Sequence, residues 1–206
     1  MTEILEIHPL NPEPRRIRRV VDVLRAGKLV IYPTDSSYAF GFHMGDKSPI
    51  REIQRIRQTS RTHNFTLVCR DLGEIAIYAK VDNSCYRTLK AHTPGPYTFI
   101  LQATRDVPRR LQNKRSKTIG IRVPDHPVPQ AILDELGEPL MSSTLLLPGD
   151  DLPITDLDEM QQRLKGDVEL IVDSGGCGIE PTTVVDLTSG FPRVLRQGKG
   201  SVDDFV

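Results

Sequence analysis

The sequence predicts an α/β fold in a single domain, residues 1–206, with one large, mixed and twisted sheet flanked by helices. Three observations lead to this prediction. Strand-like apolar runs alternate with helix-like segments along the chain, no repeat or linker interrupts them, and 206 residues suffice for one domain with a substantial core. The order of the strands stays open at this stage.

The first third of the chain contains two predicted helices. Pro14 suits the first position of the first helix, which four apolar residues at helical spacing extend to Gly27. The second helix begins at Ser48, with three isoleucines on one side. The predicted strands around these helices are residues 4–8, 29–32 and 65–69.

Three further helices are predicted in the rest of the chain. Asn83 caps the first, and Pro94 must end it because proline lacks an amide donor. The second carries Val128 and closes at Gly137, and Thr155 caps the third. The remaining predicted strands are residues 97–103, 118–123, 139–147, 168–172, 183–187 and 193–196.

Composition predicts a globular protein, with 38% hydrophobic and 26% charged residues. No apolar run approaches the roughly 20 residues that a membrane span needs. The first residues lack a basic start followed by an apolar core, so we expect no signal peptide and a cytoplasmic location. The three cysteines, Cys69, Cys85 and Cys177, are widely spaced, which favours reduced thiols over a disulfide framework or a metal site.

The charge of the chain is distributed unevenly although it sums to zero. Residues 1–122 hold 22 Lys and Arg against 11 Asp and Glu, and residues 123–206 hold 5 against 16. The densest basic run is Arg105, Arg109, Arg110, Lys114, Arg115 and Lys117. Such a run either forms a positive face that attracts phosphates or is spread over the surface as solvated side chains, and the sequence leaves both open.

The stretch IYPTDSSYAFG, residues 31–41, places one acid and three hydroxyl residues at the end of a predicted strand. Pro33 cannot donate to a sheet, so the strand ends there or lies at an edge. Thr34, Asp35 and Ser36 then lie on a loop at a strand end. The loop is either a turn that satisfies its own backbone or part of a ligand site.

Common nucleotide-binding and hydrolase motifs are absent: the chain contains neither GxxxxGK[ST] nor GxGxxG, HExxH or GxSxG. The glycine-rich stretch at 175–178 follows a predicted strand but does not enter a helix, which makes it a weak candidate for a phosphate loop. The candidate site must therefore come from elsewhere in the chain.

Six short blocks each place hydroxyls, a proline or an arginine at the end of a predicted strand. They are YPTDSSYAFG (32–41), TPGPYTFIL (93–101), TIGIRVPDHP (118–127), MSSTLLLPG (141–149), PTTVVDLT (181–188) and VLRQG (194–198). Strand ends of this kind could converge on a cleft suited to a phosphorylated ligand. In this order the blocks resemble the YciO branch of the YrdC-like family of threonylcarbamoyl-AMP synthases, from about residue 11 to residue 200.

This resemblance implies a YrdC-like fold with a concave, basic cavity. It also implies a nucleotidyltransferase reaction, in which threonine, bicarbonate and ATP give threonylcarbamoyl-AMP and pyrophosphate, with Mg²⁺ on the phosphates. The product serves the threonylcarbamoyladenosine modification of tRNA, and some members of the family are described as binding double-stranded RNA.

The resemblance assigns substrate- or nucleotide-binding roles but no catalytic residue and no metal ligand. The assigned residues are Thr34, Asp35, Ser36, Tyr38, Arg57, Thr98, Arg122, Ser143, Thr183 and Arg196. Asp35 and the hydroxyls would orient the amino acid, Arg57 and Ser143 would contact phosphates, and Arg122 and Arg196 would support phosphates or a carboxylate.

Two departures from the family pattern concern the ATP pocket. The family's Lys-x-Arg pair reads Arg57-Gln58-Thr59 here, and its Ser-x-Asn ends in Leu145. Losing an arginine and an asparagine together could cost ~10²–10⁴ in binding or rate. The arginines that could restore the charge are Arg55, Arg61 and Arg70.

Three functions follow from these observations. The first is a threonylcarbamoyl-AMP synthase, weakened by its altered pocket. The second is a non-catalytic protein that binds double-stranded RNA or a nucleotide, although the chain has few aromatic residues for stacking on bases. The third is a different acyl-adenylate or carbamoyl chemistry, in which Leu145 enlarges the apolar wall of the cavity.

Overall fold

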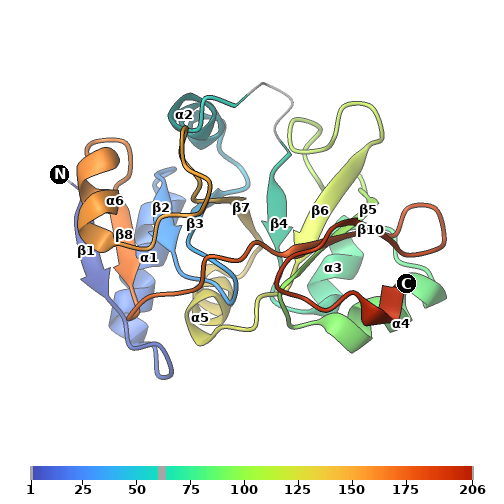
Figure 1. Ribbon diagram of the computed structural model, residues 1–206. Helices are drawn as coiled ribbons and strands as arrows, with labels where there is room; N and C mark the ends of the chain where they lie inside the picture. The colour runs from blue at the N-terminus through green and yellow to red at the C-terminus, as the bar shows by residue number, and fades with distance from the viewer. Residues whose placement is uncertain (1, 60–63, 206) are drawn as a thin grey trace.

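The computed structural model describes residues 2–59 and 64–205, and in them one ten-stranded sheet runs through the molecule (Figure 1). The strands are β1 (Glu3–Glu6), β2 (Val30–Tyr32), β3 (Ala39–His43), β4 (Thr66–Val68), β5 (Tyr97–Gln102), β6 (Thr118–Arg122), β7 (Leu140–Thr144), β8 (Leu170–Asp173), β9 (Thr183–Asp186) and β10 (Arg193–Arg196). Their order in the sheet is β1-β8-β2-β3-β7-β4-β6-β5-β9-β10, with parallel and antiparallel neighbours. This confirms the predicted mixed sheet.

Six α-helices and one short 3₁₀ helix accompany the sheet in the described part of the chain. They are α1 (Pro14–Arg25), α2 (Ser48–Ile56), α3 (Leu72–Tyr78), α4 (Asn83–His92), α5 (Pro127–Leu136), α6 (Leu157–Arg163) and η1 (Asp203–Phe205). None of the helices in these residues has the length and apolarity to cross a lipid bilayer.

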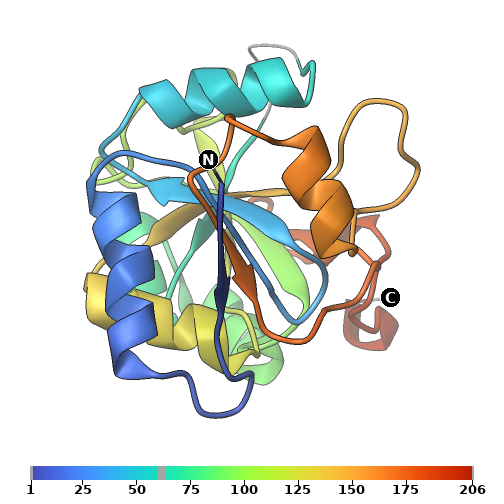
Figure 2. The same cartoon turned by 90° about the vertical axis from the view of Figure 1, so that its left-hand side faces the viewer.

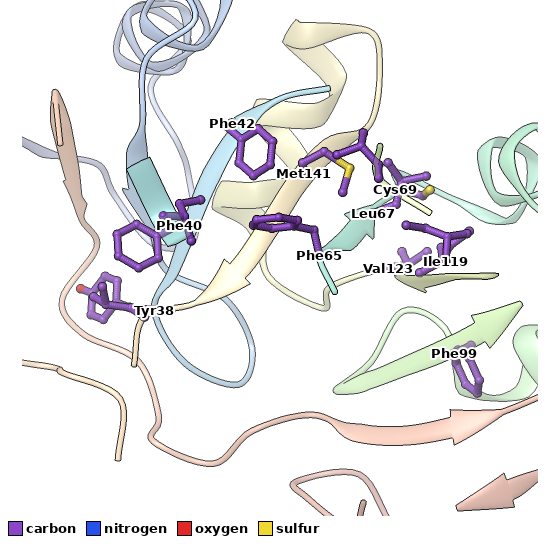
Figure 3. Close-up of a cluster of buried hydrophobic side chains, with 14 of the residues drawn as sticks. Tyr38, Phe40, Phe42, Phe65, Leu67, Cys69, Phe99, Ile119, Val123 and Met141 are labelled. Atoms are coloured by element: carbon purple, nitrogen blue, oxygen red, sulfur yellow. The ribbon is translucent and has the colours of Figure 1, made fainter. Parts of the chain in front are cut away.

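The apolar residues of the strands alternate between two core clusters, as expected when successive side chains point to opposite faces of a sheet. Val30 packs in the cluster that contains the apolar sides of α1 and α5. Ile31 packs in the other cluster, with residues of α2, α3, α4 and α6 and the aromatic rings shown in Figure 3. Figure 2 shows α1 and α5 side by side on one side of the sheet, with α2 and α6 on the other.

Helices α1 and α5 cover only part of their face of the sheet, and this explains where a cavity can form. Val68 and Leu140 pack against the cluster that contains these two helices. Thr66 and Ser142, two residues away on the same strands, continue the same face, but both line a cavity instead. The cavity therefore lies where the helical cover ends.

Most predicted elements are present, with ends that differ by a few residues, but β3 and α3 were missed. The caps of two helices also differ from the prediction by one residue. Asp82 caps α4 by accepting from the Cys85 amide at 2.8 Å, and Asp156 caps α6 by accepting from the Glu159 amide at 2.8 Å. Aspartate is as good an N-cap as the predicted asparagine or threonine. Residue type alone therefore does not tell which of two neighbouring residues caps the helix.

Candidate functional site

A candidate site is a cavity of about 490 Å³ on the part of the sheet face that α1 and α5 leave uncovered. It is lined by four of the residues predicted from the sequence, Arg57, Thr98, Ser143 and Arg196. These four come from segments that are far apart in the chain. Thr98, Ser143 and Arg196 come to one cleft from three strands, and Arg57 comes to it from the end of a helix.

The floor of the cavity is a row of residues that are paired across neighbouring strands. The register aligns Ser142 with Thr66, Thr66 with Gly120, Gly120 with Ile100, and Ile100 with Asp186. All five line the cavity. Gly120 leaves the centre of the row without a side chain, so a ligand can approach the backbone there.

Arg57 lies at the edge of this floor, directly after α2. Its Nε donates to the carbonyl of Leu146 at 3.0 Å, and its Nη1 donates to Ser143 Oγ at 2.5 Å. Burial lowers the pKa of Arg57, because a charged guanidinium loses solvation there. These two bonds fix the direction of the guanidinium group, which stays positively charged at the wall of the cavity.

Arg196 occupies another wall of the cavity, on β10. Its Nε and Nη2 donate to the carbonyl of Thr182 at 3.1 and 2.8 Å, and Thr182 Oγ1 lies 2.9 Å from Thr98 Oγ1. Burial lowers the pKa of Arg196 as well. No carboxylate of the described residues forms an ion pair with Arg196, so the charge of Arg196 remains available to an anion.

Thr183, which the sequence assigned to the site, is turned away from the cavity. Its Oγ1 donates to the carbonyl of Gly200 at 2.6 Å and accepts from the Gly198 amide at 3.0 Å. The side chain therefore fastens the C-terminal segment, and the preceding Thr182 lines the cavity. Alternation along β9 explains the difference, because neighbouring residues face opposite sides.

Side chains of the loop after β2 form hydrogen bonds with the backbone of the same loop, which was one of the two interpretations of the sequence. Thr34 Oγ1 accepts from the amides of Ser36 and Ser37 at 3.1 and 3.2 Å and donates to the carbonyl of Ser37 at 2.7 Å. Both Thr34 and Ser36 are buried and neither lines the cavity. Their hydroxyls shape the loop.

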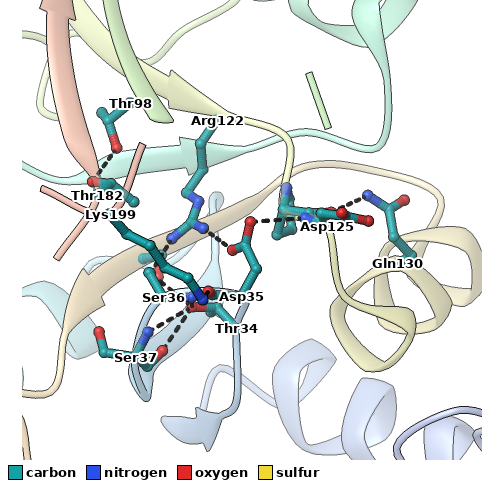
Figure 4. A network of polar contacts seen from close by, with 12 residues as sticks. Thr34, Asp35, Ser36, Ser37, Thr98, Arg122, Asp125, Gln130, Thr182 and Lys199 are labelled. Atoms are coloured by element: carbon teal, nitrogen blue, oxygen red, sulfur yellow. Dashed lines mark hydrogen bonds and ion pairs between the residues drawn. The ribbon is translucent and has the colours of Figure 1, made fainter. Parts of the chain in front are cut away.

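Asp35 and Arg122 connect this loop to the end of β6 (Figure 4). One Asp35 carboxylate oxygen accepts from Arg122 Nη2 and the other from the Asp125 amide at 3.0 Å. Arg122 Nη1 also donates to Ser36 Oγ at 3.2 Å, and Lys199 Nζ donates to the Asp35 carbonyl at 2.5 Å. Asp35 and Arg122 are therefore partners of each other, beside the cavity rather than in its lining.

The remaining predicted contributors lie elsewhere. Tyr38 reaches a different hollow. Arg55 is exposed and pairs with Asp167 at 2.5 Å, and Arg70 lies within 4 Å of carboxylates at the far end of β4. Neither lines the cavity, so neither replaces the missing family arginine there. Arg61, the third candidate, lies outside the described residues.

Leu145 is wholly buried in the core and does not line the cavity. The prediction that it enlarges an apolar wall of the site is therefore wrong. The neighbouring Thr144 lines the cavity instead. Leu145 follows the end of β7 and packs into the core, whereas Ser143, two residues earlier, lines the cavity.

Sequence reasoning missed several polar lining residues. Asn64, Thr66, Asn113 and Asp186 all line the cavity. A signal was present in PTTVVDLT, where the polar residues at 182, 186 and 188 share one strand face, with Val184 between them. Such alternation marks one polar face of a strand.

Part of the basic run predicted from the sequence lies on a loop that also contributes to the lining of the cavity. Leu111, Asn113 and Ser116 line the cavity and belong to the same loop as exposed Arg109 and Lys114. Anionic ligands longer than the cavity would therefore meet positive charge on this loop.

Comparisons with known proteins agree on the relatives of this chain. Residues 22–198 match the family Sua5_yciO_yrdC, described as telomere recombination. "Uncharacterized protein YciO" of Escherichia coli K12 is 48% identical over 206 residues, covering 100% of both chains. "Threonylcarbamoyl-AMP synthase" of Serratia proteamaculans is 26% identical and covers 87% of this chain and 94% of its own length.

Solved structures show the same fold. The crystal structure of E. coli YciO has a TM-score of 0.95 at 48% identity and full coverage of both chains. P. abyssi Sua5 complexed with L-threonine has a TM-score of 0.89 at 24% identity, with 98% of this chain and 59% of that chain covered.

Proposed function

The chain belongs to the Sua5/YciO/YrdC family, and from this premise we propose that it is an ATP-dependent, threonylcarbamoyl-AMP synthase-like enzyme. Two guanidinium groups carry this proposal. Arg57 and Arg196 both line a cavity with many hydroxyl side chains, and each donates hydrogen bonds to carbonyl or hydroxyl oxygen atoms beside it. An arrangement of this kind favours a ligand with several negative charges, such as a triphosphate.

The proposed reaction forms one carbon–nitrogen bond and exchanges one phosphorus–oxygen bond. The amine of threonine combines with bicarbonate, with loss of water, to give a carbamate. An oxygen of the carbamate then attacks the α-phosphorus of ATP, and the bond to pyrophosphate breaks. Negative charge accumulates on the phosphate oxygens in this step, which is where preorganised donors contribute most.

The chain's own residues would bind and orient the substrates. Arg57, with Ser143 beside it, would hold phosphate oxygens at one wall, and Arg196 would do so at another. Thr98 and Thr182 share a hydrogen bond and would offer their remaining capacity to threonine or ribose. The described residues contain no group of three or more His, Cys, Asp or Glu that could hold a metal ion, so Mg²⁺ would enter as part of the nucleotide substrate.

We propose that the synthase activity of this protein is weak. Thr59 and Leu145 stand where the family pattern carries an arginine and an asparagine, and neither lines the cavity. We propose that the product serves tRNA modification in the cytoplasm, as in the synthases.

Pyrophosphate release tests this function. With ATP, threonine and bicarbonate at high enzyme concentration, we expect release that depends on threonine. Arg57→Gln should lower it by roughly tenfold to a hundredfold, because a charged partner of the phosphates is lost. Arg55→Gln, on the preceding helix but outside the cavity, is the matched control. An absence of threonine-dependent release from the unaltered protein would contradict the proposal.

A second candidate function rests on the basic loop beside the cavity, which favours binding of double-stranded RNA without chemistry. It predicts that affinity falls steeply with salt, because bound counterions are released from the RNA. Neutralising Arg109 and Lys114 should then weaken RNA binding, whereas neutralising Arg15 and Arg18 on α1 should not. Ser143→Ala would leave RNA binding unchanged but impair a synthase, so one pair of assays separates the two functions.

A further inference from the structure

A second hollow, of about 420 Å³, lies apart from the cavity and is strongly acidic. Three carboxylates line it: Asp156 and Asp158 at the start of α6, and Asp173 at the end of β8. None of the three has an ion-pair partner among the described residues, and no described lysine or arginine lines the hollow. The negative charge there is therefore uncompensated.

Tyr38 adds an observation that is independent of these acids. Its ring is wholly buried in the core, and its hydroxyl lies at the outer end of the ring, away from the other aromatic side chains (Figure 3). Tyr38 lines the hollow, and its buried hydroxyl lies near two other lining residues, Asp173 and Gly176. This hydroxyl has no hydrogen-bond partner within the described structure. The Gly176 amide lies beside it without the geometry of a hydrogen bond. Burial raises the pKa of Tyr38, so the group stays a neutral hydroxyl with two free lone pairs.

Local structure explains part of this arrangement but not all of it. Asp156 caps α6, and Asp158 in the first turn is favourable to the helix dipole. Asp173 also has a local role, because its Oδ1 accepts from the Gly175 amide at 2.9 Å in the turn after β8. No such local contact satisfies the unpartnered hydroxyl of Tyr38. A buried polar group without a partner needs an explanation, and a bound ligand is one.

We propose that this hollow binds a small organic cation, an alkylammonium or guanidinium group on a short apolar stem. The acids supply counter-charge, the Tyr38 oxygen accepts a hydrogen bond from the cation, and half-buried Leu157 contacts the stem. A metal ion fits less well, because the described acids form no cluster close enough to share one ion. A cation with several N–H donors can span acids that are farther apart.

Calorimetry at low salt with putrescine, agmatine and uncharged 1,4-butanediol tests this site. It needs neither ATP nor threonine, so its outcome is independent of the proposed synthase activity. We expect saturable binding of one or both cations and none of the diol. Equal heats from cation and diol, or displacement of the cation by equimolar Mg²⁺, would overturn the proposal.

Two variants test the residues, each with a matched control. Tyr38→Phe removes only the hydroxyl and should weaken cation binding at least about tenfold, as expected for a lost hydrogen bond to a charged group. Asp158→Asn changes an exposed side chain, leaves the Asp156 cap in place and should weaken binding similarly. Asp151→Asn and Tyr86→Phe, both outside the hollow, should not. If Tyr38→Phe and Asp158→Asn bind the cation as the unaltered protein does, the site is refuted, and the hydroxyl is satisfied by water alone.

Discussion

Asp35 and Arg122 form a buried ion pair that joins the loop after β2 to the end of β6. Each side chain is only 9% exposed. Arg122 lies opposite Thr98, because the adjacent Phe99 and Ile121 are paired in the antiparallel register. The ion pair thus lies next to Thr98 of the cavity lining without being part of the lining itself.

Breaking this pair should cost a large part of the stability of the fold. Asp35→Asn leaves a buried guanidinium without its counter-charge, and we expect a loss of about 3–5 kcal/mol in the free energy of unfolding. Denaturant unfolding measures it. The same change at Asp125, whose backbone amide rather than side chain contacts Asp35, is the control and should cost little.

A double variant shows whether the cost comes from the unpaired charge. Asp35→Asn combined with Arg122→Met removes both charges and should be more stable than Asp35→Asn alone. If the free energy of unfolding of Asp35→Asn lies within about 0.5 kcal/mol of that of the unaltered protein, the ion pair does not stabilise the fold.

Arg196 should matter for phosphate binding, whereas Arg193 on the same strand should not. Arg196→Gln removes a charge that lines the cavity, and we expect ATP and tripolyphosphate to bind roughly tenfold to a hundredfold more weakly by calorimetry. Arg193 pairs with Asp186 and its side chain is 70% exposed, so Arg193→Gln should change binding by less than about threefold. Similar losses in both variants would indicate a general charge effect.

The sequence predicted the class of fold because hydrophobic periodicity and turn residues are local signals. It missed β3, where YAFGFH is buried on both faces and shows no alternation, and α3, which has seven residues and contains Gly73. Both elements depend on packing against distant parts of the chain. Local sequence pattern therefore predicted most helices and strands, but not those that depend on distant packing.

The candidate site was predictable only where a motif resembled a known family. Arg57 and Arg196 line the cavity as expected, but Thr183 and Leu145 face away from it. A shift of one residue in a strand moves a side chain to the other face, and in β9 the polar residues at 186 and 188 were the local signal for the face that lines the cavity. The Asp35–Arg122 contact depends on the strand order, which the sequence left open.

Gly120 should control how closely a ligand approaches the floor. A Cβ at this position would lie 3.2 Å from Thr98 Cγ2 and 3.7 Å from Thr66 Oγ1. We expect Gly120→Ala to lower the free energy of unfolding by about 1–3 kcal/mol through overpacking, and to weaken ATP binding.

A second substitution separates these two effects. Thr98→Ser removes the crowded methyl group but keeps the hydroxyl that bonds to Thr182. In Gly120→Ala/Thr98→Ser the stability should return towards that of the unaltered protein, while ATP binding stays weak because the added methyl still covers the floor. Recovery of both would show that the ligand does not contact the floor at Gly120.

The stability of the fold should fall as His126 becomes protonated. Burial lowers the pKa of His126 below its ordinary value of 6.5, with Asp35 and Asp125 opposing the shift. The unfolded chain therefore binds a proton more readily than the folded one, so this contribution is complete above pH 6.5 and is lost as the pH falls through the lowered pKa. Protonation also removes the Nδ1 acceptor that caps α5 at the Val128 amide, 3.1 Å away.

His126→Asn keeps a capping oxygen without a titrating group. Its free energy of unfolding should depend less on pH between about pH 5 and pH 7 than that of the unaltered protein. Denaturant unfolding at several pH values measures the two slopes, and identical slopes would rule out His126 as their source.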